Sequence, residues 1–93
     1  MKRIRVYNMV SPKGNKVANQ FEITTKDGIY FQSYSSIIAY KRFRDGQIFL
    51  DEYYWDYSNT TGKYRNIFLG DWGIEETREK IASKEYKLKN LNK

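Results

Sequence analysis

The residues of this sequence that could do chemistry gather in one segment, where cationic and amide side chains follow a pair of threonines. Lys63 and Arg65 can neutralise phosphate oxygens, and Asn66 can pair with the edge of an adenine base. A helix that begins near Thr60 and Thr61 would add free backbone amides, which also attract anions. The segment therefore predicts a helix that presents Lys63, Arg65 and Asn66 to a nucleic acid.

The ends and the apolar period of the segment both indicate a helix. Ser58 and Thr60 are good N-cap residues, because a hydroxyl accepts hydrogen bonds from the free amides of a first turn. Gly70 stands where a residue in the left-handed conformation would end the helix. Three apolar residues recur on one side of a 3.6-residue period and are expected to face the core: Tyr64, Ile67 and Phe68.

The residue types that are absent limit the possible chemistry. The chain has no histidine and no cysteine, which excludes thiol nucleophiles, histidine-based triads, the usual zinc sites and the commonest general base. Asp51, Glu52 and Asp56 form an acidic run, but their spacing does not fix an octahedral oxygen site. We expect no catalytic residue, no metal and no cofactor, and hence a protein that is not an enzyme.

Size and charge favour a small binding protein. The 93 residues are enough for one domain, spanning residues 1–93, and they carry a formal net charge of +6. Such a charge favours an anionic partner, either nucleic acid or an acidic protein surface. There is no apolar run of membrane-spanning length and no signal-type start, so we expect a cytoplasmic protein without membrane contact. The oligomeric state stays open.

The N-terminal segment alternates as a strand does. Ile4 and Val6 fall on one face of residues 2–9, and Arg3, Arg5 and Tyr7 fall on the other. Arg3 and Arg5 are therefore expected side by side on whichever face is not core. The turn-rich segment 11–16 follows as a solvated connector, and its glycine and lysine do not have P-loop spacing.

Two Asp-Gly turns, at residues 27–28 and 45–46, each separate two alternating runs. The runs span 20–25 and 29–34 in the first pair, and 37–43 and 47–51 in the second. Such turns are typical of hairpins, because glycine takes the positive φ that a tight turn demands. They predict an antiparallel meander with one solvated face. The expected core residues of the first hairpin are Phe21, Ile23, Ile29 and Phe31.

Basic and aromatic residues alternate around the second hairpin. The basic ones are Lys41, Arg42 and Arg44, and the aromatic ones are Tyr30, Tyr34 and Tyr40. Cations for phosphates beside rings for base stacking are what a single-stranded nucleic-acid site requires. The same residues also have a structural interpretation, since tyrosine favours strands and lysine protects sheet edges. Both interpretations stay open.

The C-terminal third predicts a second helix over residues 73–83, capped by Asp71, with acidic residues early and basic residues late. Residues 86–91 alternate again and could form a final short strand. The fold class expected is therefore α+β, with an antiparallel β-meander of two Asp-Gly hairpins packed by two short C-terminal helices.

Two stretches of the chain resemble a known family. They are GNKVANQF (14–21) with GIYFQSYSSIIA (28–39), and WDYS (55–58) with TTGKYRN (60–66) and FLG (68–70). They resemble small uncharacterised proteins of bacteriophages and other mobile elements, mostly of Gram-positive hosts. The resemblance implies a phage-encoded accessory protein in the bacterial cytoplasm, but it carries no function to transfer.

Two functions follow from these observations. The favoured one is nucleic-acid binding through the cationic helix and the aromatic and basic sheet face. The alternative is a protein–protein inhibitor of a host enzyme or of an anti-phage defence system, because exposed tyrosine, tryptophan and arginine are typical of interface hot spots. Salt separates the two functions, since phosphate contacts weaken steeply as the salt concentration rises.

Overall fold

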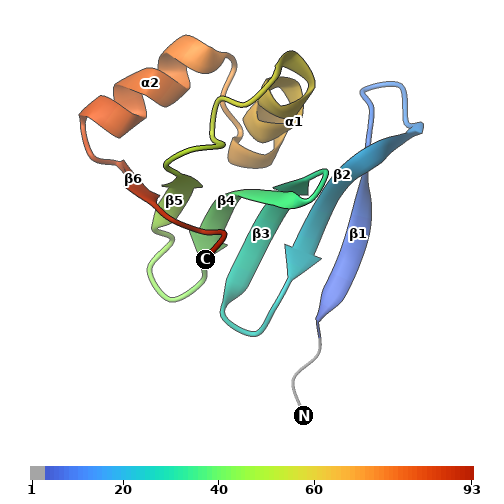
Figure 1. Ribbon diagram of the computed structural model, residues 1–93, viewed down its shortest axis with the longest axis horizontal. Coiled ribbons are helices and arrows are strands. Elements are labelled where there is room, and N and C mark those ends of the chain that lie inside the picture. The colour runs from blue at the N-terminus through green and yellow to red at the C-terminus, as the bar shows by residue number, and fades with distance from the viewer. Residues whose placement is uncertain (1–3) are drawn as a thin grey trace.

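The computed structural model describes residues 4–93 (Figure 1). Within this range the chain forms a six-stranded sheet and two helices that follow one another between the fifth and sixth strands. The elements are β1 (Arg5–Val10), β2 (Lys16–Thr24), β3 (Gly28–Ser33), β4 (Ser36–Arg42), β5 (Ile48–Asp51), α1 (Asn59–Leu69), α2 (Ile74–Ala82) and β6 (Tyr86–Lys89). The predicted α+β meander is confirmed, and so is the final strand.

The strands lie in chain order across the sheet, from β1 at one edge to β6 at the other. Each pair from β1 to β5 is antiparallel, whereas β5 and β6 are parallel. Figure 1 shows α1 and α2 together on the same side of the sheet. A parallel pair needs a long crossover, and the two helices supply it while they cover that side.

The core lies between the two helices and the side of the sheet that they cover. Its buried apolar side chains are Met9, Phe31, Ile38, Ala39, Leu50, Tyr64, Phe68 and Tyr86. The rings of Phe31 and Phe68 meet with their centroids 5.8 Å apart, which joins β3 to α1. Tyr64 and Phe68 therefore face the core as predicted, whereas Ile67 is 48% exposed, so the prediction for Ile67 was wrong.

The ends of α1 confirm the prediction from its capping residues. The Ser58 hydroxyl accepts from the Thr61 amide at 3.1 Å, and Gly70 adopts a left-handed φ of 77°. The predicted cap of α2 was wrong. Gly73 is the N-cap of that helix and makes no side-chain hydrogen bond there, while Asp71 points into a separate polar cluster.

The first hairpin turns one residue earlier than the Asp-Gly pair suggests. The Thr25 amide donates to the Gly28 carbonyl at 2.8 Å, so Lys26 and Asp27 are the central residues of the turn. The Thr25 hydroxyl accepts from the Asp27 and Gly28 amides, which holds this turn. Consequently Glu22 lies opposite Phe31.

This register corrects the predicted core. Directly opposed residues of an antiparallel pair point to the same face of a sheet. Ile23 is opposite Tyr30, and Phe21 is opposite Gln32, so the two β2 residues lie on the face away from the helices. Phe31 is fully buried and Ile29 packs against the core, but Phe21 and Ile23 do not belong to it.

Gly28 is required for a different reason from the one that the turn pattern suggests. Its φ is not positive, unlike that of Gly46 in the second hairpin, which is 72°. A Cβ atom at Gly28 would lie 2.3 Å from the Lys41 carbonyl oxygen and 2.5 Å from the Tyr40 ring. The β3–β4 hairpin therefore needs a residue without a side chain at this position.

One buried aspartate, Asp71, links α2 and β6 to the end of α1. Asp71 accepts hydrogen bonds from Thr77 Oγ1 at 2.7 Å, Tyr86 Oη at 2.8 Å and Lys80 Nζ at 3.0 Å. Burial raises the pKa of Asp71, but these three donors lower it by more, so its pKa lies below the ordinary value. The ionised carboxylate is thus part of the folded structure.

We predict that Gly28→Ala lowers the free energy of unfolding by about 1–3 kcal/mol, because the new methyl group overlaps a backbone oxygen. Urea denaturation followed by tryptophan fluorescence measures this loss. Gly62→Ala, inside α1, is the matched control, since the nearest atom to a Cβ there is at an ordinary contact distance of 3.6 Å. Equal losses in the two variants would contradict the close approach at Gly28.

We also predict that Asp71 stabilises the fold in a pH-dependent way. A carboxylate with a lowered folded pKa contributes stability above its unfolded pKa and loses it as the pH falls through the folded pKa. The difference in unfolding free energy between wild type and Asp71→Asn should therefore shrink when urea titrations are repeated from pH 6 down to about pH 2. A constant difference over that range would show that the charge of Asp71 has no part in stability.

Candidate nucleic-acid interface

The face of the sheet away from the helices carries one row of side chains that runs across every described strand. The paired residues, from β1 to β6, are Val6, Ile23, Tyr30, Tyr40, Phe49 and Lys87. We call this set the cross-strand row, and the face that bears it the open face. No helix of residues 4–93 covers this face, because α1 and α2 both pack on the other one.

The middle of the cross-strand row is a ladder of aromatic rings. The Tyr30 and Tyr40 rings stack with their centroids 4.3 Å apart and their planes 21° from parallel. Tyr40 and Phe49 continue the ladder at 6.2 Å and 19°. Tyrosine rings that are half-buried in this way offer both apolar surface and a hydroxyl to a partner.

Two cations lie over the last ring of the ladder. The guanidinium carbon of Arg42 is 5.0 Å from the centroid of Phe49, and the Lys89 ammonium is 5.2 Å from it. Both distances are within the range of a cation–π attraction. Positive charge therefore flanks the rings at the β5 and β6 end of the row.

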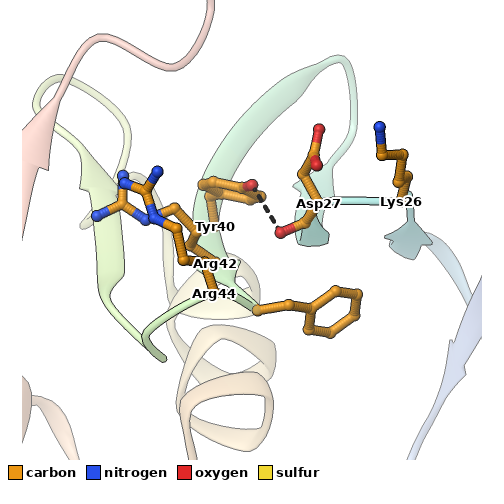
Figure 2. Close-up of a pocket in the computed structure, with 6 residues that line it drawn as sticks. Lys26, Asp27, Tyr40, Arg42 and Arg44 are labelled. Atoms are coloured by element: carbon orange, nitrogen blue, oxygen red, sulfur yellow. Dashed lines mark hydrogen bonds between the residues drawn. The ribbon is translucent and has the colours of Figure 1, made fainter.

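A hollow of about 610 Å³ opens beside Tyr40, at the tips of the two hairpins. Figure 2 shows Arg42 and Arg44 on one side of Tyr40, and Asp27 and Lys26 on the other. The Tyr40 hydroxyl donates to the Asp27 carbonyl at 3.1 Å, which fixes the ring between the hairpins. Burial, with smaller effects from Tyr30 and Asp27, raises the pKa of Tyr40, so this hydroxyl keeps its proton at neutral pH.

The cations around the hollow differ in whether a carboxylate of the protein already pairs with them. Arg42 donates to both carboxylate oxygens of Asp45, at 3.1 and 2.8 Å, and this pair holds the pKa of Asp45 well below its usual range. Lys26 and Arg44 are exposed and have no carboxylate within 4.0 Å among residues 4–93. Lys26 and Arg44 are therefore free to meet an anion.

The prediction that α1 presents Arg65 outward was wrong. Arg65 is 1% exposed, donates to the Trp55 carbonyl at 2.6 Å and lies 5.4 Å from the centroid of the Trp55 ring. Burial lowers its pKa, and Asp56, 3.8 Å away, acts in the opposite direction. A long arginine at the border of an apolar stripe can bury its stem and stack its planar end on an aromatic ring.

The neighbours of Arg65 on α1 are affected as well. Asn66 accepts from Arg65 at 3.1 Å, so its amide oxygen is already engaged. Thr61 is fully buried, with its hydroxyl 2.8 Å from that of Ser33. Lys63 and Thr60 remain exposed, and they are the predicted helix residues most accessible to a phosphate.

The remaining predicted residues are scattered. Lys41 lies on the helix-covered face, 5.6 Å from the centroid of the Phe68 ring. Tyr34 has a φ of 56° in the β3–β4 turn, at the opposite end of β3 from the hollow. Arg5 lies on the far edge strand, and Arg3 lies outside the described residues. Of the predicted set, the fold therefore brings together Tyr30, Tyr40, Arg42 and Arg44.

The sequence interpretation missed three residues of this site. Phe49 reaches it by pairing with Tyr40 across the second hairpin. Lys89 reaches it because β6 pairs with β5, nearly forty residues earlier in the chain, and no local pattern carries that information. Lys26 reaches it because the first hairpin turns at Lys26 and Asp27. For Lys26, the sequence offered one signal of a place in the site, namely a lysine in a turn beside a tyrosine-rich strand.

The acidic run has a structural role where it is buried. Asp51 is fully buried and accepts from the amides of Tyr53, Tyr54 and Leu91 at 2.8–3.0 Å. Asp56 lies within 4.0 Å of Arg65 and Arg78. Residues 4–93 contain no group of three or more acidic side chains placed to hold a metal ion.

These features define a class of small α+β proteins in which helices cover one side of a meander sheet and the other side is aromatic and basic. Residues 4–87 match the model of a family of unknown function, DUF8033, and the chain belongs to that family. No curated protein and no solved structure matches the chain. Neither helix in the described range is long and apolar enough to cross a membrane.

Proposed function

We propose that this protein binds single-stranded nucleic acid on the open face of its sheet. The observation that carries the proposal is the cross-strand row, in which stacked rings lie beside cations on a face that no described helix covers. In this arrangement Tyr30 and Tyr40 contact bases, and Arg44 and Lys26 contact phosphates at the rim of the hollow.

The form of the site supports a single strand over a duplex. A ring of the ladder can stack only on a base whose face is free, and duplex bases are already stacked on their neighbours. Stacking of this kind is worth about 1–3 kcal/mol per base and tolerates any sequence. We therefore expect modest sequence preference and a clear preference for single strands.

The charges support the same proposal. The net charge of +6 attracts a polyanion from a distance, and Lys26 and Arg44 can take up phosphates without first losing a protein partner. Arg42 is held over Phe49 by Asp45, so its part is to shape the end of the ladder. No catalytic group is needed for this function, in keeping with a binding protein, and a bacteriophage accessory role stays a prediction.

One observation favours a protein partner as the second candidate. Trp72, between α1 and α2, is 81% exposed, and Tyr53, in the connection between β5 and α1, is 75% exposed. Tryptophan and tyrosine are the residues most often found at interface hot spots. Binding at Trp72 would be much less sensitive to salt than binding through phosphates.

We predict that the Lys26→Ala, Arg44→Ala double variant binds short single-stranded DNA and RNA more weakly and with a shallower salt dependence. Each lost phosphate contact should reduce the slope of log affinity against log salt by about 0.7. Fluorescence anisotropy of labelled oligonucleotides, single- and double-stranded, at several salt concentrations gives both quantities.

The Lys13→Ala, Lys16→Ala double variant has the same loss of charge at the exposed β1–β2 connection and serves as the control. It should keep most of the affinity of the wild type. Equal losses in both double variants would mean that only the net charge matters, and no binding by the wild type at low salt would refute the proposal.

We further predict that Tyr30→Leu, which keeps an apolar side chain but removes the ring, weakens single-strand binding by about tenfold, the lower part of the range for one lost stacking contact. Tyr53→Leu, in the exposed connection between β5 and α1, is the control and should bind as the wild type does. Urea denaturation of both variants checks that the fold is kept. Unchanged affinity in Tyr30→Leu would remove the ladder from the site.

A further inference from the structure

The β1 edge of the sheet is unusually apolar for a strand with a free side. Within residues 4–93, β1 pairs with β2 alone. Three apolar side chains of β1 are at least half exposed, and they lie on both faces: Val6, Tyr7 and Val10. Ile4, just before the strand, is exposed as well. Soluble proteins usually protect such an edge with charges, yet Arg5 is the one charged residue of β1.

The opposite edge of the sheet is protected in the usual way. Lys87 and Lys89 lie on β6, and the chain beyond it turns back to the sheet, where Asn92 exchanges two hydrogen bonds with the backbone of Ile37. The contrast between the edges shows that β1 is the side of the sheet left open to pairing.

The helix-covered side of the β1 edge also carries an unfilled apolar groove. It has a volume of about 240 Å³ and is lined by Tyr7, Asn8, Met9, Val10, Glu22 and Ile67. Ile67 comes from α1 and is 48% exposed, although the rest of the apolar stripe of that helix faces the core. The groove therefore joins the helix and the edge strand into one apolar surface with a single carboxylate, Glu22.

We propose that a second copy of this chain pairs its own β1 antiparallel to this β1, so that the two sheets form one continuous sheet. An antiparallel strand can pair with itself about a two-fold axis, and the same patch then serves both copies. If the axis is perpendicular to the sheet, the two open faces lie on the same side. The exposed apolar residues of both copies meet along the seam.

The charges of Arg5 and Glu22 favour a second copy of this chain as the partner. They also favour one register between the two β1 strands. Arg5 and Tyr7 lie on the helix-covered face, and Tyr7 is opposite Glu22 in the β1–β2 pair. With Val6 on the axis, the Arg5 of each copy lies opposite the Tyr7 of the other, and the Glu22 of that copy is one strand further on, so the long arginine side chain extends toward it. With Tyr7 on the axis, Arg5 would instead lie opposite Met9. The attraction between Arg5 and Glu22 favours Val6 on the axis.

This register has a consequence for the open face. Val6 is the first residue of the cross-strand row, so pairing Val6 with Val6 joins the rows of the two copies end to end. The dimer then has two aromatic ladders on one continuous face. The inference itself rests on the edge and the groove, and it stands whether or not nucleic acid is the ligand.

The absence of cysteine from the chain makes a sharp test possible. In Val6→Cys, the two thiols on the axis would face each other across an antiparallel pair, where the Cα atoms are about 4.5–5.5 Å apart and a disulfide can form. Mild oxidation at low protein concentration should give a covalent dimer on a non-reducing gel. Lys87→Cys, on the opposite edge, is the control and should remain largely monomeric.

Sedimentation equilibrium supplies the second measurement. Wild type should show twice the mass of the chain, and Val6→Lys, which places two ammonium groups on the axis, should show the mass of a monomer while it keeps its circular dichroism spectrum. A wild type that is monomeric at all concentrations up to about millimolar overturns the proposal. Cross-linking of Tyr7→Cys in place of Val6→Cys overturns the register.

Discussion

The close approach of β4 to Gly28 is the constraint on which the sheet depends. The Lys41 carbonyl and the Tyr40 ring occupy the space that any side chain at position 28 would need. With the turn closed between Thr25 and Gly28, this contact sets the register of β2, β3 and β4. The stacking of Tyr30 on Tyr40 is a direct consequence of that register.

Two buried polar groups then decide which side of the sheet stays open. Arg65 ties α1 to the Trp55 segment through a hydrogen bond and a cation–π contact, and Asp71 ties α2 to Tyr86 of β6. Both groups would be costly to bury without these partners, so they fix the helices in place. The helices therefore cover one face of the sheet and leave the cross-strand row exposed on the other.

The open face and the β1 edge are two parts of one surface. The aromatic ladder and its cations suit a single-stranded polyanion, whereas the apolar β1 edge suits pairing with an identical strand. The cross-strand row begins at the edge, with Val6, and ends with Lys87. Self-pairing would therefore lengthen the ligand surface without adding any new element to the chain.

Local structure followed from the sequence, because caps, turns and alternation act over a few residues. The sequence predicted both hairpins, the Ser58 and Gly70 ends of α1, a second helix and the last strand, and it placed Tyr40 near Arg42 and Arg44. Tertiary structure alone decided which face each residue occupies, since a shift of one residue in a turn reverses every side chain of a strand. It also decided that Arg65 is buried on Trp55, and that Lys89 lies over Phe49, because both contacts depend on segments packed together from distant parts of the chain.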